Sequence, residues 1–169
     1  SQEILTKKAL MKRLAIAFSG PSNSGKTTLI LKVAKKFIDD GLKVVVVKHD
    51  PGDKAKFDVE GKDSFKFSQA GADVVVMSPT RTTYFSQSSQ GIDEVIRMIG
   101  EFDILLVEGL KTLPLPRLSV FRGEIDEAYL SFSDAIATYK EHIPYEITNL
   151  NLDDIDAICA WIIKNAKAV

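Results

Sequence analysis

The sequence predicts an α/β domain of three layers, in which helices flank a mostly parallel sheet with added mixed or antiparallel strands. A short apolar run at Arg13–Ser19 leads into a loop rich in glycine and serine, and a helical pattern begins at Gly25. A second apolar run, Lys43–Lys48, follows that helix. Strand, helix and strand in such close succession form one crossover unit, the building block of parallel sheets.

Local patterns justify the first elements. The helix from Gly25 presents apolar residues every three to four positions, and Gly41 is the expected stop. Four consecutive valines within Lys43–Lys48 predict a strand covered on both faces. Residues 49–61 are polar and show no period, so we expect a long loop. Loops of that length within compact domains are usually functional.

The rest of the chain continues the alternation of strands and helices. The expected elements are a helix at Lys62–Ala70, strands at Asp73–Met77 and Thr80–Phe85, a helix at Gly91–Gly100, strands at Asp103–Val107, Arg117–Phe121, Ala135–Thr138 and Tyr145–Ile147, and a helix from about Leu152 to Lys164. We find neither a repeat nor a linker and expect one domain over residues 1–169. The strands at Thr80–Phe85 and Arg117–Phe121 are not expected at the sheet centre.

Composition excludes several functional classes. The 169 residues include 22 Lys+Arg and 23 Asp+Glu, and this balance argues against a surface built for nucleic acid or anionic lipid. The longest apolar runs, Val44–Val47 and Ile104–Val107, fall far short of the roughly 20 residues that span a bilayer. The segment Ser1–Lys8 has no apolar core of signal-peptide length. With Cys159 as its one cysteine, the chain is expected to be cytoplasmic, without a nucleic-acid or membrane partner.

The strongest motif is GPSNSGKT at Gly20–Thr27, which matches the phosphate-loop pattern G-x-x-x-x-G-K-[ST] between a predicted strand and a predicted helix. The glycines let the loop wrap a phosphate, while backbone amides and the helix N-terminus supply positive potential. Lys26 is expected to reach the β- and γ-phosphates, and the Thr27 hydroxyl to bind Mg²⁺. The predicted nucleotide-binding residues are Gly20, Ser22, Asn23, Ser24, Gly25, Lys26, Thr27 and Thr28. The motif predicts a P-loop NTPase fold.

A second feature is the apolar strand at Asp103–Val107, which ends at Glu108. In P-loop proteins, a carboxylate at the carboxyl end of a neighbouring parallel strand points toward the Mg²⁺ site. We therefore predict Thr27 and Glu108 as metal residues and Lys26 and Glu108 as catalytic residues. Neither the phosphate loop nor the surroundings of Glu108 offer an obvious arginine finger in cis.

A third feature follows the second strand, where Lys48, His49 and a loop rich in carboxylates are expected on the phosphate side of the sheet. The loop either handles a second anionic ligand or is simply solvated. The candidates for a second ligand or a switch are His49, Asp58, Lys62, Asp63, Arg81 and Lys111. Arginines near strand ends, among them Arg117 and Arg122, are individually more typical of surface charges. The wide spacing of the histidines and Cys159 argues against a protein zinc site.

Several stretches together resemble one family, that of the molybdopterin-guanine dinucleotide biosynthesis adapter, protein B. They are Gly20–Thr28, Lys48-His49, Phe57-Asp58, Gly61–Ser64, Gln69–Ala72, Val107–Lys111 and Pro116–Arg122. The resemblance implies a Mg²⁺-dependent GTP-binding protein with slow hydrolysis. It further implies that the protein assists the molybdenum cofactor guanylyltransferase, which joins GMP to molybdopterin, and that molybdopterin is a further candidate ligand. By the same resemblance, Lys26 and Thr27 are the nucleotide and Mg²⁺ residues, and His49 and Asp63 match the family's second motif.

Two departures limit what the resemblance carries. The family is usually richer in histidine after Lys48-His49, whereas Asp50–Asp53 stands here, so a metal or pterin role of that segment is left unsupported. Guanine selection usually depends on the tetrad N/T-K-x-D, which Thr138–Glu141 matches only loosely. The residues themselves support a nucleoside triphosphate, and GTP rests on the family.

Two alternatives stay open, a small-molecule kinase and a metallochaperone GTPase. Kinases of this fold usually close an arginine-bearing lid over the phosphates, but Thr112–Pro116 contains no arginine. We also expect a homodimer that pairs exposed strand edges and gathers Arg81, Lys111, Arg117 and Arg122 around an anionic ligand.

Overall fold

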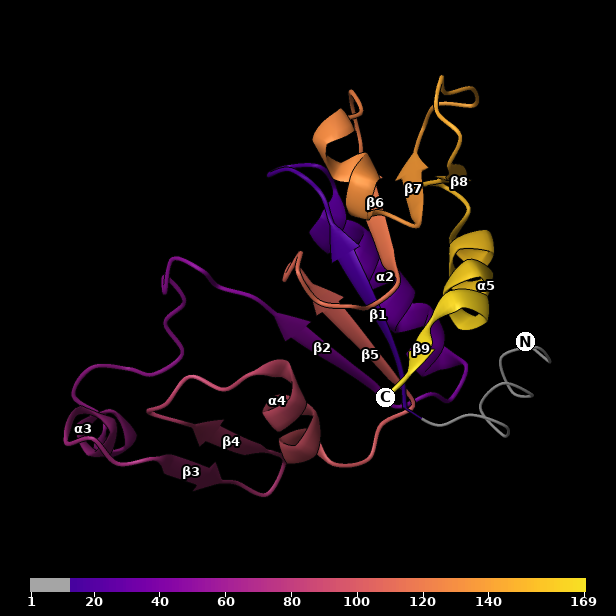
Figure 1. The fold of residues 1–169 in the computed structure, drawn as a ribbon. Coiled ribbons are helices and arrows are strands. Elements are labelled where there is room, and N and C mark those ends of the chain that lie inside the picture. Colours follow the sequence, from indigo (N-terminus) through magenta and orange to yellow (C-terminus); the bar gives the residue numbers. More distant parts are fainter. Residues whose placement is uncertain (1–12) are drawn as a thin grey trace. The chain divides into compact units, whose positions relative to one another are not determined.

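The computed structural model describes residues 13–169, and the segment Ser1–Lys8, for which no signal peptide is expected, lies outside the described residues. The chain forms two compact units (Figure 1). The sheet unit comprises the described residues up to His49 and those from Glu101 to Val169, and the small unit comprises Asp50–Gly100. Within residues 13–169 no helix combines the length and apolarity that a membrane crossing requires.

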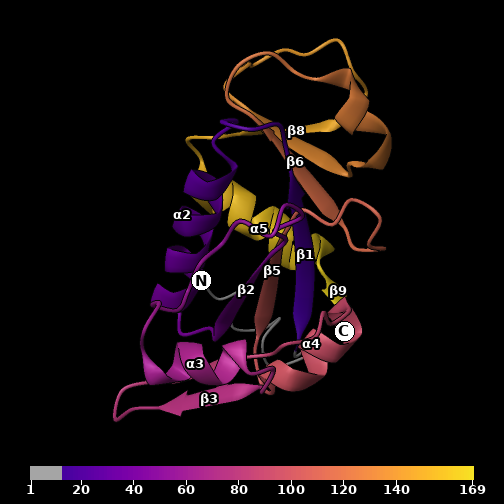
Figure 2. The ribbon, with the colours of Figure 1, turned by 90° about the vertical axis from the view of Figure 1, so that its left-hand side faces the viewer.

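The sheet unit is built on a seven-stranded sheet (Figures 1 and 2). Its strands are β1 (Leu14–Ser19), β2 (Val44–Lys48), β5 (Ile104–Glu108), β6 (Arg117–Phe121), β7 (Ala135–Thr138), β8 (Thr148–Asn151) and β9 (Lys167–Ala168). The order is β2-β5-β1-β6-β7-β8, and all pairs along this path are parallel. The short β9 pairs antiparallel with the start of β1. The expected mostly parallel α/β sheet flanked by helices is therefore confirmed.

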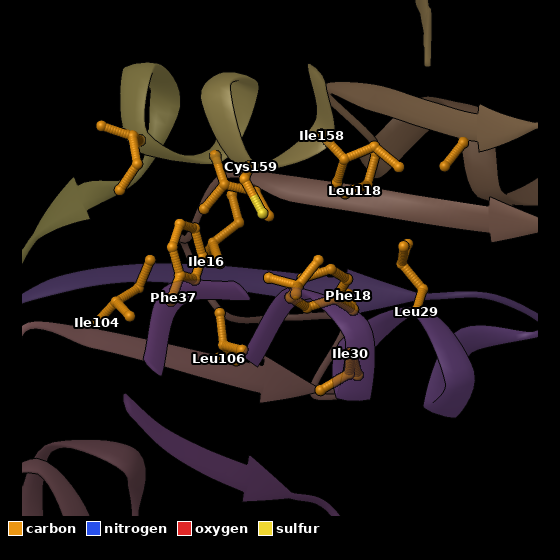
Figure 3. Packing of buried hydrophobic residues seen from close by; sticks show 14 of the residues in the cluster. Ile16, Phe18, Leu29, Ile30, Phe37, Ile104, Leu106, Leu118, Ile158 and Cys159 are labelled. Carbon is orange, nitrogen blue, oxygen red and sulfur yellow. The ribbon is translucent and has the colours of Figure 1, made fainter. Parts of the chain in front are cut away.

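Two helices, α2 (Lys26–Asp39) and α5 (Ile155–Asn165), pack against each other and against one face of this sheet (Figure 2). Figure 3 shows Phe18 of β1 and Phe37 of α2 within the resulting core, together with Cys159 of α5. These three side chains are almost completely buried. Burial raises the pKa of the Cys159 thiol to about 12, because the thiolate would lose its hydration.

The other face of β6 carries a short 3-10 helix, η1 (Glu127–Phe132). Successive side chains of a strand point to opposite faces, so Phe121 lies opposite the core residues Leu118 and Val120. The Phe121 ring meets the Tyr129 ring of η1 edge to face, with 5.7 Å between centroids. Asp126 caps η1 by accepting a hydrogen bond from the Ala128 amide.

The small unit consists of two helices and a two-stranded antiparallel sheet (Figure 1). Its elements are α3 (Asp63–Gln69), β3 (Val74–Met77), β4 (Thr82–Phe85) and α4 (Ile92–Ile99). Val74 is the one hydrophobic residue of this unit that is buried, and Met77 is 82% exposed. The expected helices and strands are present here with shifts of one or two residues.

Four expectations about individual elements are corrected by the structure. β2 is an outer strand, and Val46 is 48% exposed, so the valine run is not covered on both faces. β6 is an inner strand and fully buried, contrary to its expected place away from the centre. The last parallel strand is Thr148–Asn151 rather than Tyr145–Ile147. The final helix begins only at Ile155, because the Asp154 carboxylate caps it by accepting from the Ala157 amide.

Candidate functional site

The loop that joins β1 to α2 has the backbone of a phosphate cradle. Gly20 has φ +152°, and a Cβ at this position would lie 2.7 Å from the Val120 carbonyl oxygen and from the Ser24 hydroxyl. Asn23 and Gly25 both have positive φ, and Gly25 is the N-cap of α2 with no side-chain cap. The first amides of α2 are thus left for an external acceptor, and the helix dipole favours an anion there.

Lys26 lies on the first turn of α2 and reaches back over the loop. Its ammonium donates to the Gly20 carbonyl at 3.3 Å and lies 3.6 Å from one carboxylate oxygen of Glu108. Lys48, at the end of β2, lies 3.6 Å from the other oxygen of Glu108. The register explains this meeting, because β1, β2 and β5 are parallel and end at the same edge. Lys26 and Glu108, which the sequence assigns separately to the phosphates and to the Mg²⁺ site, therefore lie next to each other.

A pocket of about 420 Å³ opens over this loop. It is lined by Pro21, Ser22, Asn23, Ser24, Gly25, Lys26, Thr27, Thr28, Glu108 and Arg122. Seven of the eight predicted nucleotide-binding residues therefore share one pocket, and the eighth, Gly20, accepts a hydrogen bond from Lys26 of that pocket. The Ser24 hydroxyl is buried and has no hydrogen-bond partner among the described residues. Burying a hydroxyl without a partner is costly, so this atom indicates a polar ligand.

Arg117 was expected to be a surface charge, but only 1% of it is exposed. Its guanidinium donates to the Ser19 hydroxyl at 2.7 Å, to the Gly109 carbonyl at 2.8 Å and to the Leu110 carbonyl at 2.7 Å. Burial lowers the pKa of Arg117, while Asp134 acts to raise it. Arg117 thus joins the end of β1 to the residues that follow β5, and so holds the start of the phosphate loop and the segment after Glu108 in position.

Arg122 follows β6 and lines the pocket that contains Lys26 and Glu108. Its guanidinium donates to the Asn23 carbonyl at 3.1 Å, which leaves other N–H groups for a ligand. The sequence offered no obvious arginine finger in cis, and the structure places Arg122 in the same pocket as Glu108. Because the position of β6 beside β1 was not foreseen, sequence reasoning treated Arg122 as a strand-end charge.

Two further candidates of the sheet unit are engaged in local contacts. The His49 amide donates to the Glu108 carbonyl at 3.1 Å, so His49 directly flanks the site. The Lys111 ammonium lies 4.6 Å from the ring centroid of Tyr129 and 5.7 Å from that of Phe132. Cation–π attraction holds an ammonium over aromatic rings, so Lys111 ties the loop after β5 to η1.

The remaining candidates lie in the small unit. The Asp58 carboxylate accepts from the Ser64 hydroxyl and from the Val59 amide, each at 2.9 Å. Lys62 is the N-cap of α3, and Asp63 is in its first turn, where a carboxylate suits the helix dipole. Arg81 lies between β3 and β4, and its backbone bonds to Ser78. These contacts are local to the small unit.

The described residues contain no group of three or more His, Cys, Asp or Glu side chains that could by itself hold a metal ion. A magnesium ion at this site would need the Thr27 hydroxyl, the Glu108 carboxylate and oxygens of a bound ligand. That donor set fits Mg²⁺, which prefers oxygen ligands and keeps several waters or phosphate oxygens.

Comparison with known proteins identifies the family. The family model described as molybdopterin guanine dinucleotide synthesis protein B matches residues 15–140. The chain belongs to this family. A Haemophilus influenzae molybdopterin-guanine dinucleotide biosynthesis adapter protein is 28% identical over 151 residues, which cover 82% of this chain and 80% of that protein. The Escherichia coli protein of the same name is 24% identical over 160 residues, covering 88% and 91%.

A solved structure supports the same fold. The crystal structure of Bacillus subtilis MobB has a TM-score of 0.74 at 24% identity and covers 92% of this chain and 99% of that chain. The family resemblance predicted from the motifs of the sequence is confirmed.

Proposed function

We propose that this chain binds a Mg²⁺–nucleoside triphosphate in the pocket over the phosphate loop and serves as the nucleotide-binding adapter of molybdopterin guanine dinucleotide biosynthesis. Family membership supports the biosynthetic role. GTP is the nucleotide that the resemblance implies. The observation that carries the proposal is the meeting of Lys26, Thr27, Glu108 and Arg122 in one pocket at an uncapped helix N-terminus.

Each of these groups has a distinct task. Lys26 and Arg122 supply positive charge for the β- and γ-phosphates, and the free amides of α2 supply hydrogen bonds in fixed directions. Glu108 lies within 4 Å of two lysines, so it also holds the Lys26 ammonium over the loop. A bound Mg²⁺ would neutralise charge on the phosphates. Because Gly20 has no side chain, space stays open beside Ser24, and the Ser24 hydroxyl can donate a hydrogen bond to the ligand.

Hydrolysis by the isolated protein is expected to be slow. P-loop GTPases with at most an arginine in cis turn over at about 10⁻⁴ to 10⁻² per second. Arg122 is the arginine that lines this pocket. Turnover above about one per second would favour an enzyme over an adapter.

The decisive experiment is calorimetric titration of the Lys26→Ala variant with Mg²⁺–GTP. Removing the ammonium leaves phosphate oxygens without a charged partner, so we expect affinity to fall by about 100-fold or more. Lys35→Ala is the matched control, since Lys35 lies on the same helix and pairs on the surface with Asp39. Equal affinities of wild type and Lys26→Ala, with unchanged circular dichroism, would contradict the assignment.

Partner and assembly belong to the same proposal. We propose the molybdenum cofactor guanylyltransferase as the cytoplasmic partner, and co-purification tests this. The homodimer was expected to pair two exposed strand edges, those of β4 and β6. β6 lies inside the sheet and has no free edge, whereas β4 pairs only with β3 among the described strands and keeps one edge open. Light scattering that reports about twice 18.6 kDa would support a dimer.

A further inference from the structure

The Glu108 carboxylate has a lysine beside each of its two oxygens. The Lys26 ammonium lies 3.6 Å from Oε1, and the Lys48 ammonium lies 3.6 Å from Oε2. Lys26 and Glu108 line the pocket over the phosphate loop, whereas Lys48 does not. The Lys48 side chain is 65% exposed and that of Glu108 only 16%, so Lys48 contacts Glu108 from outside the pocket. The carboxylate therefore lies between one cation of the pocket and one cation behind it.

The fold determines the meeting of Lys48 with Glu108. β2 and β5 are parallel neighbours (Figure 1), and Lys48 lies directly opposite Glu108 in their register. Partners in register point to the same face of a sheet, and Phe18 of β1 occupies the next position of this row. Beyond the pair, the His49 amide donates to the Glu108 carbonyl at 3.1 Å. The backbone is thus paired on past the point where the two side chains meet, so Lys48 is held beside Glu108 before a ligand binds.

The charge of Glu108 opposes the ligand of this pocket. A triphosphate is strongly anionic, and a carboxylate in the same pocket repels it unless a cation compensates the carboxylate. Lys26 cannot compensate Glu108 fully, because its ammonium also has to reach the β- and γ-phosphates. Lys48 lies outside the pocket and stays with Glu108 when Lys26 turns to the phosphates. Since Glu108 is mostly buried, salt screens its charge less than that of a surface carboxylate.

We propose that Lys48 is a positioning residue of the nucleotide site, which holds and neutralises the Glu108 carboxylate so that a nucleoside triphosphate can bind before Mg²⁺ does. This inference rests on the proposed function, because it concerns the same ligand. When Mg²⁺ is bound, Glu108 has a further source of positive charge, so the contribution of Lys48 is greatest without the metal. Lys48 acts on the phosphates through Glu108 and touches no ligand atom itself.

The first test measures the affinity of Lys48→Met for GTP by calorimetry, once with EDTA and once with Mg²⁺. We expect the variant to bind metal-free GTP about 10-fold more weakly than wild type, and Mg²⁺–GTP less than about 3-fold more weakly. Lys48→Arg keeps the charge and is expected to lose less affinity in EDTA than Lys48→Met. Lys43→Met is the matched control, because Lys43 is an exposed lysine that directly precedes the same strand at its opposite end. Its affinity should equal that of wild type under both conditions.

A second test separates an action through Glu108 from a direct contact with the phosphates. In the Glu108→Gln background there is no negative charge to compensate, so Lys48→Met should not weaken the binding of metal-free GTP any further. A lysine that bound the phosphates directly would lose the same factor in both backgrounds. This double-mutant cycle isolates the coupling between Lys48 and Glu108. Because Lys48 is largely exposed, the midpoint of urea denaturation should be nearly the same in Lys48→Met and wild type.

The outcomes separate the two proposals. If Lys26→Ala weakens GTP binding but Lys48→Met has no effect in EDTA, the role of Lys48 is wrong and the proposed function stands. Equal losses with and without Mg²⁺, or equal losses in the two Glu108 backgrounds, overturn the role of Lys48 in the same way. If wild type binds GTP only when Mg²⁺ is present, the inference fails while the nucleotide site remains. If wild type does not bind GTP under either condition, both proposals fail.

Discussion

The sheet unit and the small unit use apolar residues in opposite ways. In the sheet unit, Phe18 and Phe37 are completely buried between sheet and helices. In the small unit, Phe57, Phe67 and Met77 are all more than half exposed. The phosphate loop is thus supported by a close-packed core, whereas Asp58 in the small unit is held by local hydrogen bonds to the Ser64 hydroxyl and the Val59 amide. A motif built on a packed core can hold a ligand in a fixed geometry. A motif with few buried contacts depends on its ligand or partner to fix its geometry.

The largest test of this comparison exchanges one phenylalanine in each unit for alanine. Phe37→Ala opens a cavity in the core and is expected to lower the free energy of unfolding by about 3–5 kcal/mol. Phe67→Ala removes a side chain that is 57% exposed, so we expect a loss below about 1 kcal/mol. Denaturant titration followed by circular dichroism measures both. Similar losses in the two variants would refute the contrast.

A second, somewhat smaller test of the same comparison replaces one arginine in each unit by methionine. Arg117→Met leaves the Ser19 hydroxyl and two carbonyls without their donor, and at about 1 kcal/mol for each bond the expected loss is about 3 kcal/mol. Its affinity for nucleotide should fall as well, because the loop and Glu108 lose their common anchor. Arg97→Met in the small unit breaks only an exposed pair with Glu94, worth less than about 1 kcal/mol. Chemical denaturation that ranks these variants equally would argue against an anchoring role.

The smallest expected effect concerns Cys159, which reports on the sheet unit alone. Its thiol has a pKa of about 12 in the fold, against about 8.5 in an unfolded chain. Because the folded pKa is the higher one, stability is retained below about pH 8.5 and declines as pH rises toward 12. At pH 10 this difference is about 2 kcal/mol relative to neutral pH.

In Cys159→Ala the free energy of unfolding should not show this loss of about 2 kcal/mol between neutral pH and pH 10. Urea titration of wild type and variant at pH 7.5 and pH 10 measures the difference. In native wild type at pH 8, the buried thiol should react with a thiol reagent only as fast as the sheet unit opens. Rapid reaction at a rate independent of urea would mean that Cys159 is accessible in the fold.

Much of the sheet unit was predictable because its signals are local. The run before Gly20 and the helix after Gly25 are encoded by residues next to each other in sequence, and so is the phosphate loop between them. The position of Glu108 at a strand end was predictable for the same reason, since an apolar run leads directly into it.

What failed depends on contacts between distant residues. Val46 belongs to a strand with the composition of a central one but lies in an outer strand, because strand order is set by tertiary pairing. The strand Thr148–Asn151 is polar and short, so no periodicity marks it. Arg117 and Arg122 have the composition of surface residues, and only the insertion of β6 beside β1 gives them their roles.

The strand order also determines when each strand of the sheet can find its neighbour while the chain is being synthesised. β1 lies between β5 and β6, and the bond from Arg117 to Ser19 spans 98 positions of the sequence. At a synthesis rate of about 5–20 residues per second, roughly 5–20 s pass between the emergence of β1 and that of β6. For most of that interval, until β5 is made, β1 has neither of its neighbouring strands, although the phosphate loop has already been translated. A nascent chain interrupted before Arg117 would carry the nucleotide motif with β5 available to pair with β1, but without the Arg117 anchor and without Arg122.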